Sequence, residues 1–168
     1  MINIGINGFG RIGRLILRAI LENYRNKINV VAINDLGSIE TNAHLIKYDS
    51  THGTINEEIH TSKDGFKVGQ QDIKVFAEKD PADIPWAKVG ADVVLECTGI
   101  FLDKSSAEKH IKGGAKKVII SAPAKEVDFT IVQGVNSKDL KKDHNIISNG
   151  SCTTNCLAPV AMVLEKTF

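Results

Sequence analysis

The chain has 168 residues, 42% of them hydrophobic, and a formal net charge of +1 at pH 7. This length and apolar content fit one folded domain, or one domain with a short extension, and argue against intrinsic disorder. The balanced charge and the absence of a long apolar run argue against nucleic acid or a membrane as the main partner.

The N-terminal third alternates patterns typical of strands and helices. Apolar residues alternate with small or polar ones over Ile2–Ile6, which predicts a strand, and Gly8–Gly13 predicts a turn. Apolar residues recur on one helical face over Ile12–Ile20. A second strand is expected over Asn29–Asn34, and a short helix over Asn42–Tyr48.

The rest of the chain continues this alternation. Glu57–Phe76 predicts two or three short strands separated by glycine turns, and Asp92–Cys97 predicts a buried strand. Ser105 and Glu108 form a possible capping box for a helix that runs to about Lys112. Three further strands are expected over residues 117–121, 129–132 and 146–148. The pattern predicts an α/β fold of Rossmann type, a doubly wound, mostly parallel sheet with a small antiparallel excursion.

A glycine-rich turn predicts a dinucleotide site. Gly8, Gly10 and Gly13 form a G-x-G-x-x-G between a predicted strand and a predicted helix, whose N-terminus would face a diphosphate. Asp35 follows at the expected distance of about 20 residues, at the end of the next strand. Its carboxylate can accept from ribose hydroxyls and would repel a 2′-phosphate, which favours NAD over NADP. The alternative is a purely structural glycine turn beside a surface aspartate.

A polar elbow near the C-terminus predicts a reactive thiol. Cys152 lies between a predicted strand and the apolar stretch Leu157–Leu164, at the expected N-terminus of a helix. Unpaired N–H groups and the helix dipole favour a thiolate there, so Cys152 is the candidate nucleophile. A neighbouring backbone N–H could hold the oxyanion formed by its attack. Cys156, one helical turn later, is expected to be structural rather than a resolving thiol.

The cysteine pattern and the N-terminus indicate the compartment. The three cysteines, Cys97, Cys152 and Cys156, include no C-x-x-C pair, which argues against a disulfide framework or a zinc ribbon. No signal-peptide pattern precedes the first strand. A reduced, cytoplasmic protein without a metal is therefore expected.

The elbow Ser148–Cys156 resembles the active-site signature of glyceraldehyde-3-phosphate dehydrogenases, with Gly150 where that family usually has alanine. Glycine at this position is expected to loosen the elbow. The resemblance covers the whole chain. Its other blocks are Ile6–Arg14, Ala32–Leu36, Lys47–Gly53 and Glu96–Phe101.

The resemblance implies a set of site residues. Arg11 and Ile12 would contact the diphosphate, Asp35 the ribose, and Lys79 the adenine side. The cofactor-binding residues that it implies are Gly8, Gly10, Arg11, Ile12, Gly13, Asp35, Lys79, Thr98, Gly99 and Ser121. The substrate-binding residues that it implies are Ser151, Cys152 and Thr153, with Cys152 as the catalytic nucleophile.

The resemblance also implies a reaction and an assembly. In that family a cysteine thiolate attacks glyceraldehyde 3-phosphate, hydride passes to NAD, and inorganic phosphate cleaves the resulting thioester to 1,3-bisphosphoglycerate. The implied setting is glycolysis in the cytoplasm, and the implied assembly is a homotetramer. No nucleic acid or membrane partner is implied.

The family's subunit continues beyond the position of Phe168 and supplies its catalytic histidine there. The expected organisation is therefore an NAD-binding Rossmann domain over residues 1–150. Residues 151–168 would form the active-site elbow and first helix of a truncated catalytic domain. Such a fragment is expected to bind NAD, to be inactive, and to expose an apolar patch.

Two other interpretations remain open. Erythrose-4-phosphate dehydrogenase is a close relative with the same nucleophile motif, but it typically has glutamate at the ribose position, so Asp35 favours the glycolytic enzyme. A non-catalytic nucleotide-binding module would also fit the chain. Aspartate-semialdehyde dehydrogenase shares the architecture, but its motifs match poorly.

Overall fold

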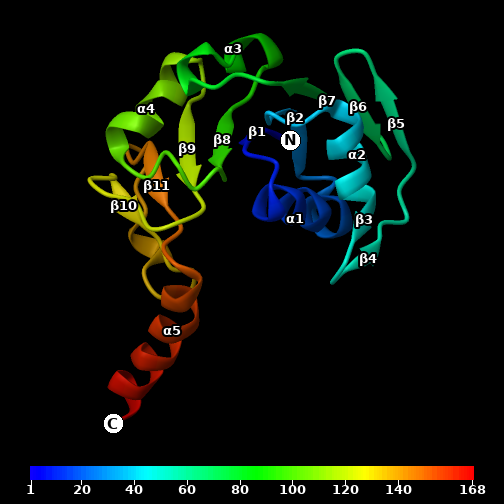
Figure 1. The fold of residues 1–168 in the computed structure, drawn as a ribbon. Coiled ribbons are helices and arrows are strands. Elements are labelled where there is room, and N and C mark those ends of the chain that lie inside the picture. The colour runs from blue at the N-terminus through cyan, green and yellow to red at the C-terminus, as the bar shows by residue number, and fades with distance from the viewer.

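The computed structural model describes all residues from Met1 to Phe168, and one large sheet organises it (Figure 1). The strands are β1 Ile2–Asn7, β2 Ile28–Asn34, β3 Tyr48–Asp49, β4 Gly53–Thr54, β5 Ile59–Ser62, β6 Gly65–Val68, β7 Gln71–Phe76, β8 Val93–Glu96, β9 Lys117–Ile120, β10 Phe129–Thr130 and β11 Ile146–Ser148. The α-helices are α1 Arg11–Ala19, α2 Ile39–Lys47, α3 Trp86–Val89, α4 Lys104–Lys112 and α5 Cys152–Thr167. A π-helical turn, Ile20–Tyr24, extends α1, and 3-10 turns lie at Pro81–Asp83 and Ser137–Asp139.

The large sheet has nine strands in the order β10-β11-β9-β8-β1-β2-β7-β6-β5. The strands from β10 to β7 are parallel, while β6 and β5 add antiparallel pairs at one edge. A separate antiparallel pair joins β3 to β4. The chain winds away from β1 in both directions, first to β2 and later to β8. This confirms the predicted doubly wound, mostly parallel sheet with a small antiparallel excursion.

Helices cover both faces of the sheet. Leu17 of α1 and Ile46 of α2 belong to the largest apolar cluster, which contains Ile4 and Ile6 of β1. Gly5, between those isoleucines, faces the opposite side, where a Cβ would lie 2.3 Å from the Trp86 ring of α3. The alternation of side chains along β1 thus separates the two layers.

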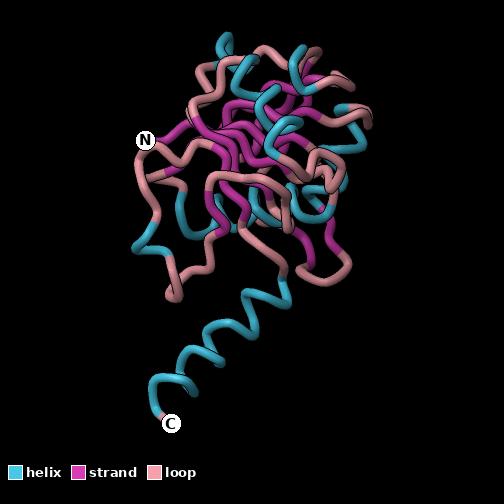
Figure 2. Tube along the Cα trace, turned by 90° about the vertical axis from the view of Figure 1, so that its left-hand side faces the viewer, coloured by secondary structure: helices cyan, strands magenta, loops and turns pink.

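Helix α5 projects away from the body of the molecule (Figures 1 and 2). None of its residues is buried. Its exposed large apolar side chains are Leu157, Val160, Val163 and Leu164, followed by Phe168. The exposed apolar surface expected from the sequence is therefore present on α5. No helix in the structure has the length and apolar content needed to cross a membrane.

The sequence placed several element boundaries wrongly. Helix α2 begins at Ile39 because the Ser38 hydroxyl accepts from the Thr41 N–H, which caps the helix three residues before the expected start. Strand β10 ends at Thr130, two residues before the expected limit.

The expected capping box at Ser105 and Glu108 is also wrong. Asp103 caps α4, with Oδ1 accepting from the Ser106 N–H at 2.9 Å. Ser105 instead donates its hydroxyl to Asp103 at 2.6 Å. The charged carboxylate, which is the stronger acceptor, therefore takes the capping role.

Replacing Asp103 by alanine is expected to lower the free energy of unfolding by about 1 kcal/mol, since the first turn of α4 loses its cap. Glu108→Ala, on the exposed face of the same helix, should change it by less than about 0.5 kcal/mol. Urea unfolding of both variants measures the difference, and equal losses would contradict the assignment of the cap.

Candidate functional site

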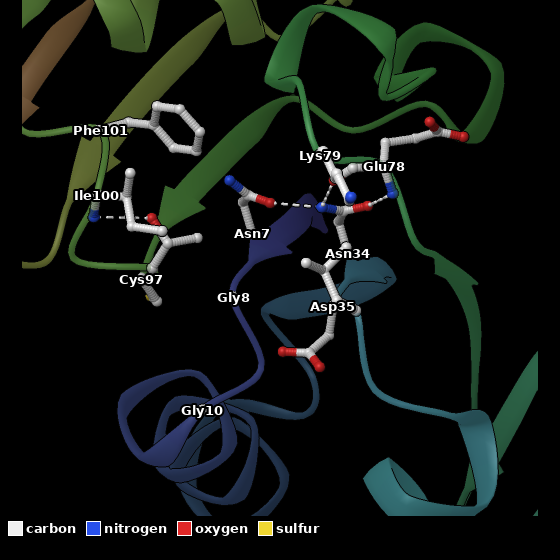
Figure 3. A pocket seen from close by; sticks show the side chains of 12 residues that line it. Asn7, Gly8, Gly10, Asn34, Asp35, Glu78, Lys79, Cys97, Ile100 and Phe101 are labelled. Atoms are coloured by element: carbon white, nitrogen blue, oxygen red, sulfur yellow. Dashed lines mark hydrogen bonds between the residues drawn. The ribbon is translucent and has the colours of Figure 1, made fainter.

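A cavity of about 520 Å³ opens at the carboxyl ends of β1, β2 and β8, where the strand order reverses (Figure 3). Its lining residues are Asn7, Gly8, Gly10, Asn34, Asp35, Leu36, Glu78, Lys79, Cys97, Thr98, Ile100 and Phe101. Open α/β sheets bind ligands at such a switch point, because the loops that follow the strands diverge there.

The glycine-rich turn leaves room for a ligand at one position only. Gly8 has φ +88°, and a Cβ there would lie 2.7 Å from the Thr98 nitrogen. A Cβ on Gly13 would lie 2.3 Å from the Gly8 carbonyl oxygen. A Cβ on Gly10 would meet nothing within 4 Å. Gly8 and Gly13 are therefore required by the fold, whereas Gly10 keeps the entrance to α1 open.

The N-terminus of α1 can accept an anion. Gly10 caps the helix without a side-chain hydrogen bond, and its first turn contains no acidic residue. The first backbone N–H groups, from Arg11 and Ile12, have no partners within the helix by geometry, and the helix dipole favours negative charge there. A dinucleotide diphosphate fits this combination of open space and unpaired donors.

Asp35 holds the glycine-rich turn against the end of β2. Its Oδ2 accepts from the Phe9 N–H at 2.9 Å, and its Oδ1 accepts from the Gly37 N–H at 2.8 Å. Each carboxylate oxygen can accept a second hydrogen bond, so both can still bind ribose hydroxyls. The sequence did not predict this second, structural task of Asp35.

The side chain of Arg11 is engaged by the β3–β4 hairpin. Its Nη1 donates to Asp49 Oδ2 at 2.7 Å. The His52 and Thr51 N–H groups, together with the Arg11 charge, lower the pKa of Asp49 to about 2. Arg11 therefore joins α1 to the hairpin, and its backbone is the part that faces the phosphate position.

The structure brings together about half of the cofactor residues expected from the sequence. The expected residues that line the cavity are Gly8, Gly10, Asp35, Lys79 and Thr98. Arg11, Ile12, Gly13, Gly99 and Ser121 lie outside this lining. Three polar lining residues were not assigned to the site from the sequence: Asn7, Asn34 and Glu78. Asn7 and Asn34 end the strands next to the glycine turn, which is the signal that could have identified them.

Cys97, at the end of the strand that the sequence predicted to be buried, is half-buried and lines the cavity. Burial raises the pKa of its thiol to about 11, and the neighbouring Glu96 charge acts in the same direction. The thiol is therefore protonated at neutral pH and contributes packing surface rather than a nucleophile.

The elbow before α5 is built as the sequence predicts, with Cys152 as the first helical residue. Ser151 caps the helix by accepting from the Thr153 N–H at 3.2 Å, and its hydroxyl lies 3.9 Å from Cys152 Sγ. Asn155 Nδ2 donates to the Asn149 and Ser151 carbonyls at 2.7 and 2.9 Å. These bonds fix the turn and leave Cys152 exposed.

Gly150 gives this elbow a backbone conformation that the sequence did not predict. It is buried and has φ +66°, a conformation that glycine adopts without strain. The elbow requires this left-handed turn between β11 and the Ser151 cap.

The sheet topology and the cavity at its switch point are those of a Rossmann-type domain that binds a dinucleotide. Residues 2–104 match the family described as glyceraldehyde 3-phosphate dehydrogenase, NAD binding domain. The chain belongs to this family, and NAD is the cofactor of the domain.

Curated relatives extend the similarity to the whole chain. Glyceraldehyde-3-phosphate dehydrogenase 1 of Bacillus cereus is 54% identical over 169 residues, covering 100% of this chain and 50% of the relative. The Streptomyces coelicolor enzyme is 55% identical over 99% of this chain and 50% of its own length. The Xanthobacter flavus enzyme is 53% identical over 98% of this chain and 49% of its own length. The chain thus spans about half the length of the curated relatives it matches.

Gly10→Ala should separate cofactor binding from folding. The new methyl group meets no protein atom but projects into the space left for the diphosphate, so the melting temperature should stay near that of the wild type. NAD affinity should fall roughly tenfold or more, as measured by calorimetry. Gly13→Ala is the matched control, because its clash with Gly8 should lower the melting temperature. Unchanged NAD binding by Gly10→Ala would contradict the proposed diphosphate position.

The Arg11–Asp49 pair should stabilise the fold in a defined pH range. Because the folded pKa of Asp49 is about 2, below its ordinary 3.8, its contribution is present above pH about 4 and is lost as the pH falls towards 2. Asp49→Asn should therefore lower stability at pH 6, and its deficit should shrink on acidification. The midpoint of urea unfolding, measured at pH 6 and again as the pH approaches 2, gives the deficit of Asp49→Asn. Asp139→Asn, at an exposed position, is the control. A deficit independent of pH would refute the assignment.

Proposed function

We propose that this chain is the nucleotide-binding part of a phosphorylating, NAD-dependent glyceraldehyde-3-phosphate dehydrogenase. The observation that carries the proposal is the shared edge of the sheet. Strand β11 runs parallel to the neighbouring strands, so the Cys152 elbow follows the same carboxyl edge at which the β1, β2 and β8 ends form the cavity. A nucleophile and a dinucleotide site on one edge suit hydride transfer from a covalent adduct.

The proposed cofactor contacts follow the geometry of the cavity. Gly8, Gly10 and Gly13 shape the turn, while the backbone N–H groups of Arg11 and Ile12 bind the diphosphate. Asp35 accepts from the adenosine ribose hydroxyls. Lys79 borders the adenine side, and Thr98, Gly99 and Ser121 line the cofactor cleft.

The proposed chemistry centres on Cys152. Its thiolate, at the first residue of α5, attacks the aldehyde carbon of glyceraldehyde 3-phosphate and forms a hemithioacetal. Backbone N–H groups at the start of α5, with the Ser151 and Thr153 hydroxyls, would bind the substrate oxygens. NAD, when bound, would accept the hydride that leaves the hemithioacetal carbon. Loss of the hydroxyl proton to a base completes the thioester on Cys152. Inorganic phosphate then displaces the Cys152 thiolate from the thioester and releases 1,3-bisphosphoglycerate.

For the 168-residue chain alone, we expect NAD binding without turnover. None of its five histidines forms a hydrogen bond with Cys152, whose Sγ has Ser151 as its neighbour. The division into a nucleotide domain over residues 1–150 and an elbow with its helix over 151–168 is part of this proposal. So are a cytoplasmic location and a homotetrameric full-length enzyme.

Erythrose-4-phosphate dehydrogenase is the second candidate, since it has the same nucleophile motif. Asp35 favours the glycolytic substrate because the alternative family typically has glutamate at this position. Comparing the two aldehydes at equal concentrations on the full-length protein distinguishes them, and a higher kcat/KM for erythrose 4-phosphate would overturn the preferred assignment.

Cys152→Ser should reduce phosphate-dependent NADH production by the full-length protein by a factor of roughly a thousand or more, because a hydroxyl is a far weaker nucleophile than a thiolate. Cys156→Ser, one turn along the same exposed helix, is the matched control and should keep most of the activity. NADH production followed at 340 nm measures both. Comparable losses in the two variants, or robust turnover by the 168-residue chain, would contradict the proposal.

A further inference from the structure

Two asparagines in this chain are followed by glycine: Asn7 precedes Gly8, and Asn149 precedes Gly150. In such a pair the backbone nitrogen of the glycine can attack the side-chain amide carbon of the asparagine, because glycine has no Cβ to hinder the approach. Asparagine belongs to the thermolabile residues of proteins for this reason. The two pairs have opposite surroundings, and the structure therefore separates them.

The first pair is protected by its hydrogen bonds. Asn7 is 1% exposed, its Nδ2 donates to Glu96 Oε2 at 2.6 Å, and its Oδ1 accepts from Asn34 Nδ2 at 2.8 Å. The Gly8 N–H donates to the Asn34 carbonyl at 2.8 Å. Attack on the Asn7 amide would require several of these hydrogen bonds to break together, and each buried group left unpaired is costly.

The second pair lies at the elbow between β11 and α5 and is open (Figure 1). Asn149 is exposed, and only its main chain is held: its N–H donates to the Ile120 carbonyl at 2.9 Å, and its carbonyl accepts from Asn155 Nδ2 at 2.7 Å. Its side-chain amide has no hydrogen-bond partner in the protein. The Gly150 N–H donates to Ser148 Oγ at 3.0 Å, so one hydrogen bond opens before this nitrogen attacks. Local opening of an exposed turn costs far less than exposure of a buried strand end.

We propose that Asn149 is a site of spontaneous covalent modification, at which water converts the side-chain amide to a carboxylate. The Gly150 nitrogen loses its proton to hydroxide and forms a bond to Asn149 Cγ, and the amide nitrogen takes up a proton and leaves as ammonia. Water then opens the resulting succinimide ring. Opening at Cγ gives aspartate, and opening at the main-chain carbonyl gives isoaspartate. The balance is one water consumed and one ammonia released, without an oxidant or a reductant.

The modification changes the elbow that carries Cys152. Both products place a new carboxylate three positions before Cys152. Isoaspartate also carries the main chain through the former side chain, which adds one carbon atom to the backbone and displaces the carbonyl that the Asn155 amide binds. Alanine, which the family usually has in place of Gly150, would hinder ring closure through its methyl group. This inference goes beyond the proposed function and does not depend on it.

Incubation of the folded chain in mildly alkaline buffer tests the proposal, with peptide mapping by mass spectrometry and enzymatic methylation of isoaspartate as readouts. Asn149 should convert at least roughly tenfold faster than Asn7, which is buried, and than Asn26, which is exposed but precedes a lysine. In guanidinium chloride the protection of Asn7 is lost. The two asparagine–glycine pairs should then convert at similar rates, while Asn26 stays slow.

Two variants test the chemistry itself. In Gly150→Ala the new methyl group would lie no closer than 3.7 Å to its neighbours, but it hinders ring closure, so conversion at Asn149 should fall roughly tenfold. If the positive φ of this position prevents that variant from folding, Asn149→Gln keeps an amide that must close a larger ring. Methylation of the folded Asn149→Gln chain should then fall to the level of the other asparagines.

Each result decides the question. Conversion confined to Asn149 in the folded chain, and suppressed by either variant, supports the proposal. Absence of conversion at Asn149, equal rates at Asn149 and Asn7 in the folded chain, or a folded variant that is modified as fast as the wild type overturns it.

Discussion

The central constraint in this structure is that three neighbouring parallel strands end in buried polar side chains. Asn7 ends β1, Asn34 ends β2 and Glu96 ends β8. Each satisfies the next: Glu96 accepts from Asn7, and Asn7 accepts from Asn34, which also exchanges two hydrogen bonds with the Glu78 backbone. Leaving one such group unpaired would cost about 1–3 kcal/mol, so the strand ends must stay in register. That register fixes the loops that form the cavity.

The same edge explains why the glycine turn has its shape. β1 passes directly from Asn7 into Gly8, whose positive φ turns the chain against the Thr98 backbone. The Asp35 carboxylate then accepts a hydrogen bond from the Phe9 N–H, which holds the turn that leads into α1 against the end of β2. The proposed anion site at α1 is therefore a consequence of the turn geometry. The Asp35 carboxylate, proposed to bind a ribose, also supports the turn proposed to bind a diphosphate.

The sequence predicted the parts of this fold that depend on local pattern. The alternation over Ile2–Ile6, the glycine spacing and the elbow at Cys152 each carry their information within a few residues, and the structure contains all three elements. The sequence did not predict the Asp103 cap, because Asp103, Ser105 and Ser106 all have side-chain oxygens that can accept at a helix N-terminus. Nor did it predict the hydrogen bonds that link Trp86 to His110 and His110 to Glu96, since contacts between residues far apart in the chain arise only when the sheet assembles.

The two cysteines beside the proposed chemistry show how environment separates residues of one type. Cys97 is enclosed beside the Glu96 charge, and both burial and that charge keep its sulfur protonated. Cys152 stands exposed at the first turn of a sixteen-residue helix, capped by Ser151 and without an acidic residue in that turn. A helix N-terminus favours an anion, whereas a carboxylate disfavours one. The fold thus keeps the Cys97 sulfur protonated in the cavity lining and leaves the Cys152 sulfur exposed at the start of α5.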